Sequence, residues 1–519
     1  NPSKRPHRVP NPHSPPVNPI TRQHPQPALA NKLIASPTKR VTNHSLPHDR
    51  RTLSNALPDI SDISDNSQSE AAANGLPPGA STHSTGSGQA AAGSSEPRGS
   101  ELKPDSSTES PATGLSVKQT SLALMYGLSA GHGVKHFGQG ALLVMIPSIK
   151  ATLGLSDVAV GGISSAQSIS SGLANIPAGI LTDMFRKKIA WILFTSMIMV
   201  GTGYIIIGAS PWYWALLAGV AIVGFGTSLW HAPAFGTLAA RYPERRGFAM
   251  AAHLTGAQIG NTTSPLIIGF LLAGSIGSWV VFSGIDWRWL AVIVAIPMYM
   301  TALTVIAKFK SAGAESTGSV SLGDYFTSAK RLLSNRGVLG MALLGAMRGA
   351  IHNSFQVFLV IYMREELEYS DTYVGLHIAL ITMAGIISTP IMGNVSDRTG
   401  RRPVIAFAMM SMTLIIFLFL QFDSGLTMMA LIAVLGLFFF SVMPIINAAA
   451  MDMIDKGSEG SGTALMFSGG AIIGSLTPIA AGFINQSSGF HGVVIFSGII
   501  AATGAVLSLV LPMTRSTTA

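Results

Sequence analysis

The chain has 519 residues, of which 48% are hydrophobic and 11% are charged, and it contains no cysteine. This composition excludes disulfides, zinc–thiolate sites and thiol nucleophiles. The formal net charge of +9 does not indicate nucleic-acid binding, because the basic residues beyond the first 115 positions gather in particular loops and leave no basic patch over.

Residues 1–115 form the first predicted region. They are rich in Pro, Ser, Asn, His, Gly and Ala and have almost no apolar clusters. Such a segment cannot bury enough apolar surface to offset the entropy of ordering, so we expect a disordered cytoplasmic tail. Its first 48 residues have several Lys and Arg and no acid, as organellar transit peptides do, but their many prolines disfavour the required amphipathic helix. No cleavable signal peptide is expected.

From Ser121 to Met513 the chain is a succession of apolar runs of membrane-spanning length, separated by short polar turns. These runs predict an all-α integral membrane protein with spans at 120–147, 157–181, 188–208, 211–236, 247–274, 288–308, 338–362, 371–394, 403–422, 426–449, 461–485 and 491–512. A linker at 310–336 separates residues 118–309 from residues 337–513, and its second part is compatible with an amphipathic helix on the membrane surface.

The loops alternate between basic and nearly neutral. The basic set holds Arg186, Lys187, Lys188, Arg241, Arg245, Arg246, Lys308, Lys310, Lys330, Arg331, Arg336, Arg398, Arg401, Arg402 and Lys456. The alternate loops hold only Lys150, Arg288 and Arg364. By the positive-inside rule the basic loops and both termini are cytoplasmic, and a multi-pass protein of the cell (inner) membrane is expected.

The two halves repeat each other. A shift of 214 residues places Asp157 on Asp371 and Gly179 on Gly393, and a shift of 213 places Lys135 on Arg348. A duplicated six-helix unit predicts two pseudo-symmetric bundles, with a binding site between them near mid-membrane.

Each half has a glycine, an aspartate and basic residues after its second span. The two sets are Gly179, Asp183, Lys187 and Lys188, and Gly393, Asp397, Arg398, Gly400, Arg401 and Arg402. Glycine permits close helix approach, and an aspartate at a helix end can pair with Arg or Lys and act as a conformational latch. The alternative interpretation is that these charges only set the topology.

These loops and the two six-helix halves resemble the major facilitator superfamily of secondary transporters over residues 118–513, with departures at Met184 and Arg186 in the first loop. Gly260, Pro265 and Gly269 in the fifth span resemble the glycine–proline motif of antiporters in this superfamily, although many membrane helices carry Gly and Pro for packing alone. The segment from His231 to Gly260 is most similar to the branch of fosmidomycin-resistance exporters. That resemblance implies a proton-driven exporter.

Polar side chains within the spans mark the candidate substrate site. His132, Lys135, His136 and Gln139 share one helix face, as do Arg348, His352 and Gln356. An ionisable group at bilayer depth is costly unless it faces a wet cavity or a partner. We therefore expect Lys135 and Arg348 to hold an anion. The alternative is that backbone carbonyls satisfy both groups or that they reach the membrane interface.

Every Asp and Glu from residue 118 onward falls in a predicted loop or near a helix end. Proton exchange, if the protein uses it, therefore falls to histidines, of which His132, His136, His231, His253, His352 and His377 lie in predicted spans. No metal and no cofactor is predicted.

The favoured interpretation is secondary active transport of a small organic anion by alternating access, by a monomer in the lipid bilayer. The first alternative is a broad multidrug efflux antiporter, which the lack of mid-membrane carboxylates disfavours for cationic drugs. The second is a non-transporting receptor or scaffold, which the two latch sequences disfavour. An enzyme is not expected, because the sequence has neither an ATP-binding Walker motif nor a nucleophile elbow.

Overall fold

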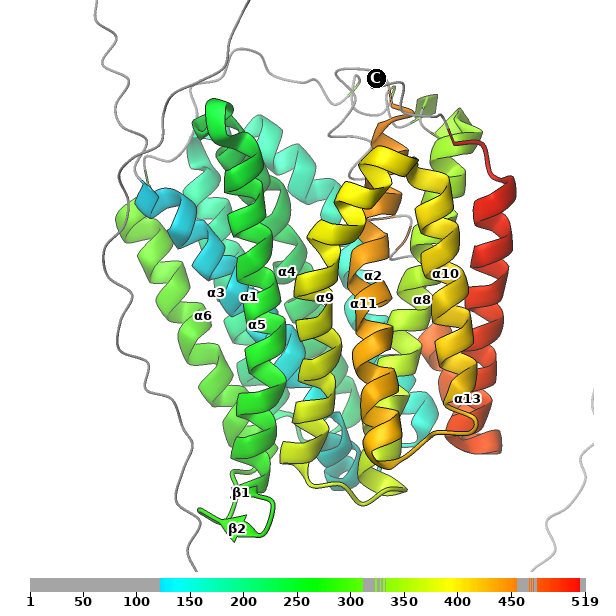
Figure 1. Ribbon diagram of the computed structural model, residues 1–519. Coiled ribbons are helices and arrows are strands. Elements are labelled where there is room, and N and C mark those ends of the chain that lie inside the picture. Colours follow the sequence, from blue (N-terminus) through cyan, green and yellow to red (C-terminus); the bar gives the residue numbers. More distant parts are fainter. Residues whose placement is uncertain are drawn as a thin grey trace, which may run out of the picture. The chain divides into compact units, whose positions relative to one another are not determined.

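The computed structural model describes residues 122–310, 333–454 and 474–513, with scattered single residues in the two gaps between them, and most of these residues are helical (Figure 1). The predicted disordered tail, most of the predicted linker and most of the first part of the predicted span 461–485 lie outside the described residues.

The first half contains α1 (Leu122–Leu153), α2 (Asp157–Met184), α3 (Ile189–Ala209), α4 (Tyr213–Arg241), α5 (Arg246–Ala273) and α6 (Trp287–Phe309). The second half contains α8 (Arg336–Glu365), α9 (Asp371–Thr399), α10 (Arg401–Leu418), α11 (Gly425–Met451) and α13 (Thr477–Val510). Short 3₁₀ turns, η1 (Arg186–Lys188) and η2 (Pro243–Arg245), precede α3 and α5.

Two features between or within helices refine the predicted spans. Helix α13 is broken at Gly489, whose φ of 63° and ψ of −169° are non-helical, and this break falls between the predicted spans 461–485 and 491–512. Glycine adopts such a positive φ without steric cost. The strands β1 (Ser275–Ile276) and β2 (Trp279–Val280) form an antiparallel hairpin between α5 and α6 that the sequence did not predict.

The sequence repeat is visible in how corresponding helices begin. Ser156 caps α2 by accepting a hydrogen bond from the backbone N–H of Ala159 at 3.2 Å. Ser370, the same position one repeat later, caps α9 by accepting from the N–H of Tyr373 at 3.3 Å. A serine hydroxyl at the N-cap satisfies a backbone donor that the first helical turn leaves unpaired.

Each half has its own apolar core. In the first half, large buried side chains such as Tyr204, Trp230 and Trp287 pack among α1, α3, α4 and α6. In the second half, Phe355 and Phe439 are at the centre of a cluster formed by α8, α9, α10, α11 and α13. Apart from Ile146 and Val160 of the first half, which belong to the second cluster, the two cores are separate, and this allows each half to move as one body.

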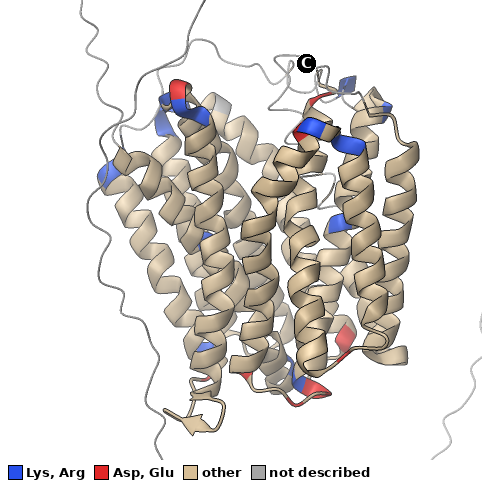
Figure 2. Ribbon diagram, in the orientation of Figure 1, with Lys and Arg blue, Asp and Glu red and all other residues tan. Residues whose placement is uncertain are grey.

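The outer surface of the helices is apolar, as a lipid environment requires. Along α6 the exposed side chains Trp289, Ile293, Ile296, Met300 and Leu303 recur every three or four residues and form one stripe. Figure 2 shows that the Lys, Arg, Asp and Glu residues of the described helices gather at the two ends of the helices and are sparse between them. The stripe and the charge distribution both fit a membrane-spanning protein.

Seven of the described segments are long and apolar enough to cross a membrane: Arg186–Ala209, Tyr213–Arg241, Trp287–Phe309, Asp371–Thr399, Arg401–Leu418, Gly425–Met451 and Thr477–Val510. Among the described helices, α1, α2, α5 and α8 are long but less apolar. These four helices contribute polar side chains to the space between the halves, which lowers their hydropathy.

The halves meet through two related helix pairs, α5 with α9 and α2 with α13. A side chain at Gly375 would overlap the carbonyl oxygen of Pro265, and one at Gly161 would overlap that of Pro478. A side chain at Gly269 would likewise overlap the carbonyl oxygen of Asp371. Glycine at these positions lets the helix backbones touch across the interface.

Candidate functional site

A cavity of about 780 Å³ lies between the two halves. Its walls come from α1, α2, α4 and α5 of the first half and α8, α9 and α11 of the second. The polar and charged side chains among its described lining residues are His132, His136, Gln139, Ser164, Gln167, His231, Thr255, Gln258, Asn261, Arg348, His352, Asn353, Gln356, Thr382, Thr389 and Asn447. None of these described lining residues is an aspartate or a glutamate.

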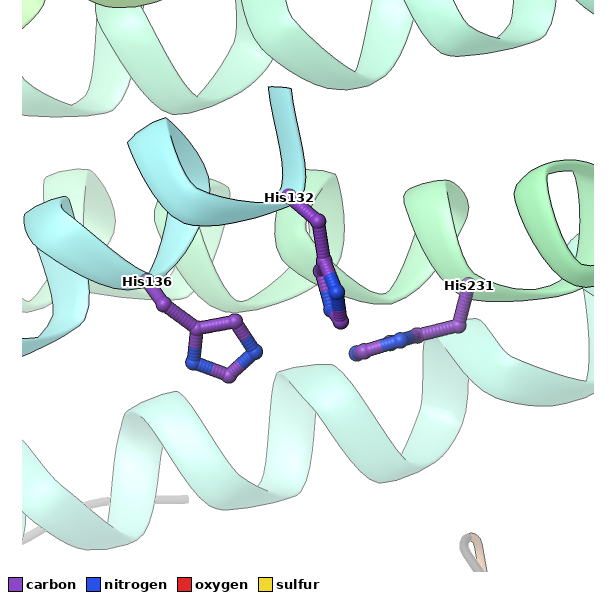
Figure 3. Close-up of side chains that lie close together, drawn as sticks. All are labelled: His132, His136 and His231. Atoms are coloured by element: carbon purple, nitrogen blue, oxygen red, sulfur yellow. The ribbon is translucent and has the colours of Figure 1, made fainter. Parts of the chain in front are cut away.

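Four histidines from three helices, here called the histidine cluster, lie at the first-half wall: His132 and His136 on α1, His231 on α4 and His253 on α5. The first three line the cavity, and His253 is buried behind them. The rings of His132 and His253 are stacked, with centroids 4.0 Å apart, and His231 meets His132 edge-on at 5.2 Å. Figure 3 shows the rings of His132, His136 and His231 turned toward one another.

Hydrogen bonds fix two of these rings. Nδ1 of His132 donates to the backbone carbonyl of His253 at 2.9 Å. Nδ1 of His136 donates to Oδ1 of Asn261 at 3.2 Å. A carbonyl oxygen can only accept, so the proton of each neutral ring is on Nδ1 and the lone pair is on Nε2.

Lys135 is fully buried behind this wall. Its Nζ lies 2.7 Å from Nε2 of His231, and the side chain is not among the described residues that line the cavity. The sequence predicted that Lys135 contacts the substrate directly. In this conformation His231 stands between Lys135 and the cavity, because α4 packs its histidine across the polar face of α1.

Arg348 lines the opposite wall. Its Nε donates to the carbonyl oxygen of Phe439 at 2.8 Å, Nη2 donates to the same oxygen, and its guanidinium lies 5.9 and 5.7 Å from the ring centroids of Phe439 and Phe440. The backbone partner expected under the alternative interpretation is therefore present. A carbonyl does not neutralise a guanidinium, however, so Arg348 still brings a positive charge to the cavity.

The remaining predicted residues mostly reach the cavity. His352 and Gln356 line it from α8, and Gln139 lines it from α1. The ring of His352 packs edge-on against Phe439 and Phe440. His377 is not among the described lining residues, and its Nδ1 instead donates to the carbonyl oxygen of Tyr373 at 2.8 Å.

Several lining residues were missing from the predicted substrate site, above all the amides Gln167, Gln258, Asn261, Asn353 and Asn447. Asn353 also links the halves, because its Nδ2 donates to Oγ of Ser168 at 3.3 Å. An inventory of amides within the apolar spans would have found them, since an amide in a membrane helix needs a polar partner or water.

Residues of the predicted second-half latch form an ion-pair network. Arg401 pairs with Asp397 and, at 3.2 Å, with Asp452 at the end of α11. Arg402 donates to the carbonyl oxygen of Leu511 at 2.7 Å. The side chain of Asp183, the corresponding residue of the first half, lies outside the described atoms.

The predicted latch glycines make no close contact with the described helices. A Cβ at Gly179 or Gly393 would meet no described atom within 4 Å in this conformation. Gly260 of the predicted antiport motif does permit one, because a side chain there would overlap the carbonyl oxygen of Gly133 on α1. Gly269 contacts α9 of the other half, as described above.

A second charged network, at the opposite end of the helices, was not predicted as functional. Nζ of Lys150 lies 2.7 Å from Asp157 of its own half and 2.5 Å from Glu365 of the other half. Asp157 in turn accepts a hydrogen bond from Asn485 of the second half at 2.9 Å. This Lys150 network therefore ties the two halves together near the β1–β2 end.

Comparison with known proteins supports the architecture. The sequence model of the family described as Major Facilitator Superfamily matches residues 128–353 and 338–518. The chain is 22% identical over 290 residues to a fosmidomycin resistance protein of Escherichia coli (strain K12), a match that covers 55% of this chain and 68% of that protein.

Solved structures show the same fold. A bacterial homolog of the human lysosomal transporter Spinster, in an inward-facing and unoccupied conformation, superposes with a TM-score of 0.65 at 14% identity and covers 76% of this chain and 97% of its own. A peptide transporter solved in complex with sulfate superposes with a TM-score of 0.59 at 15% identity, over 75% of this chain and 93% of its own.

Proposed function

The chain belongs to the major facilitator superfamily of multi-pass membrane transporters, and we propose that it moves a small organic anion by alternating access. The observation that carries the proposal is the cavity between the halves, which contains a guanidinium and four imidazoles and no carboxylate among its described lining residues. Such a wall attracts a carboxylate or phosphonate group and offers no counter-ion to an organic cation.

Arg348 is the direct anion contact in this proposal. Its Nε and Nη2 are engaged by Phe439, so its remaining N–H groups are available to a ligand oxygen. Lys135 acts through His231: its positive charge stabilises an anion near the imidazole without touching it. Gln139, His352 and Gln356 supply further hydrogen bonds that orient the solute.

The conformation fits the inward-facing state of an alternating-access cycle. The Lys150 network and the paired glycines of α5 and α9 hold the halves together at the β1–β2 end. With the basic loops assigned to the cytoplasm, that end faces away from the cytoplasm, in a cell (inner) membrane with cytoplasmic termini. Rocking the halves about the cavity would open this end and close the other.

Proton coupling is the second part of the proposal. His352 is the candidate proton carrier, because it lines the cavity and its Nδ1 is buried with no hydrogen-bond partner among the described atoms. It lies one helical turn from Arg348, and its neighbours on α11 are the uncharged Phe439 and Phe440. An anion bound at Arg348 would favour a protonated imidazole there.

The test is a transport assay on the purified chain, taken as a monomer, in proteoliposomes. A panel of small carboxylates, phosphonates and quaternary ammonium compounds is offered with and without an imposed pH gradient. Exchange of anions, stimulated by the gradient, is expected. Preference for the ammonium compounds would overturn the anionic substrate and favour a multidrug antiporter instead. Anion exchange that ignores the gradient would overturn only the proton coupling.

A further inference from the structure

The histidine cluster has a feature that anion transport does not require. One ring nitrogen of each of His132, His136 and His231 lies within 4.8 Å of one ring nitrogen of each of the others. His132 and His136 are separated by one helical turn on α1, the spacing that places two side chains over the same point, and His231 comes from α4 on the facing side (Figure 3).

We propose that His132, His136 and His231 form a binding site for a late first-row transition metal ion such as Zn²⁺, Ni²⁺ or Co²⁺. Imidazole nitrogen suits these ions, whereas Mg²⁺ and Ca²⁺ prefer oxygen ligands. Metal–nitrogen bonds of about 2.0–2.1 Å place tetrahedral ligand atoms about 3.4 Å apart. The three nitrogens must therefore approach by about 1.4 Å or less, a shift that side-chain rotation provides.

The hydrogen bonds around the cluster are those that metal-binding histidines need. A ligating imidazole usually donates its other ring N–H to a carbonyl or carboxylate, which fixes the tautomer and aims the lone pair at the metal. His132 donates from Nδ1 to the His253 carbonyl, and His136 donates from Nδ1 to Asn261. Nε2 of His132 is buried without a hydrogen-bond partner among the described atoms, so its lone pair is available to a metal ion.

The site is accessible and keeps an open position. All three histidines line the cavity, so an ion can enter from it, and three protein ligands leave a fourth position of a tetrahedral ion for water or a ligand oxygen. His352 lines the same cavity from α8 but does not belong to the group of three, so it provides a matched control.

Lys135 opposes the metal. Its Nζ holds Nε2 of His231, and an ammonium group beside a dication is repulsive whichever ring nitrogen of His231 the ion takes. The proposal therefore predicts that removing the lysine tightens metal binding. Anion transport predicts the opposite response to the same change, because the anion loses a nearby positive charge, so failure of either proposal can be recognised separately.

The experiment measures Ni²⁺ and Zn²⁺ binding to the purified full chain, without an affinity tag, by calorimetry and by elemental analysis after dialysis. Because the chain has 13 histidines, the readout is the difference between variants. The variant with His132→Gln, His136→Gln and His231→Gln should lose one bound ion, and His352→Gln should lose none. Asn261→Leu, which removes the partner of His136, should weaken this site about 10- to 100-fold. Lys135→Gln should tighten it about tenfold or more.

Two further readouts keep the result decisive. Co²⁺ titration should give the visible absorption of a four-coordinate ion in the wild type and not in the triple variant. The single variants Asn261→Leu and Lys135→Gln are compared with the wild type for elution as a folded, monodisperse protein, so that a change in their metal affinity can be attributed to the site. Equal metal stoichiometry in the wild type and the triple variant, or unchanged affinity in both of these folded single variants, would overturn the proposal.

Discussion

Lys135 Nζ lies 2.7 Å from Nε2 of His231, so the buried cation of the first half reaches the cavity only through an imidazole. Arg348, its counterpart in the second half, lines the cavity itself. The two cations of the repeat therefore have unequal roles. Substitution of Arg348 and substitution of Lys135 should weaken anion binding to different extents.

Arg348→Gln should weaken anion binding by about 1.5–3 kcal/mol, or roughly one to two decades in affinity, because a charge-assisted contact is lost. Lys135→Gln should have a smaller effect, since Lys135 acts through His231. Arg348→Lys should also be impaired. An ammonium group cannot donate to the Phe439 carbonyl and at the same time make the planar two-point contact of a guanidinium with a ligand.

These affinities are measured by substrate binding to the purified variants, with Gln139→Leu as the control for a lining amide without charge. Equal affinities for wild type and Arg348→Gln would contradict the role of Arg348 as the anion contact.

Lys150→Gln should destabilise the conformation described here, because it removes both ion pairs of the Lys150 side chain near the β1–β2 end. The partly buried pairs contribute about 1–2 kcal/mol together, which shifts the population of the two states roughly 5- to 30-fold. Single cysteines introduced near Glu365 in the natural cysteine-free chain report the shift as faster labelling from that side. Arg288→Gln is the control, since among the described residues Arg288 donates within its own half, to the carbonyl oxygen of Ser210. The same labelling rate in both variants would argue against the network as a tie between halves.

Asp397→Asn should have a small effect on the state population. The network of Asp397, Arg401 and Asp452 lies at a helix end, and the Asp397 side chain is 64% exposed. Exposed pairs contribute about 0.2–1 kcal/mol, so a change of at most about fivefold is expected in the labelling of cysteines introduced at that end of the helices. Arg398→Gln, one residue away, should leave labelling unchanged. A tenfold or larger change for Asp397→Asn would show that the aspartate has a partner beyond those described.

Gly375→Ala should open the interface between α5 and α9 in this conformation, because the added methyl overlaps the Pro265 carbonyl. Overpacking of this kind costs about 1–3 kcal/mol, so the other transport state should gain population and exchange should slow. Gly393→Ala in the same helix is the matched control, since a Cβ there meets no described atom. Thermal stability of both variants in detergent separates a state shift from general unfolding. Labelling and exchange at wild-type rates in Gly375→Ala would mean that α5 and α9 move apart to accommodate the methyl group without a cost in free energy.

Much of the fold could be read from the sequence because membrane helices follow from hydropathy and the repeat follows from spacing. Ser156 and Ser370 were alike in sequence and cap alike in the structure. The substrate-site residues could be assigned to helix faces, and all except Lys135 line the cavity. The screening of Lys135 by His231 depends on how α4 crosses α1, which no local pattern specifies. The role of Lys150 depends on a contact with Glu365, 215 residues away.

The contacts between the halves occur twice over. Gly375 meets the carbonyl of Pro265, and one repeat earlier Gly161 meets that of Pro478; Gly269 and Gly482 likewise meet the carbonyls of Asp371 and Asp157. A surface that contacts its own copy in this reciprocal way is the isologous interface of a twofold-symmetric homodimer. The geometry thus matches an ancestral six-helix subunit that paired with itself before the two copies were joined in one chain. The two copies differ at the equivalent cations. The first copy has Lys135 buried behind His231, and the second has Arg348 facing the cavity.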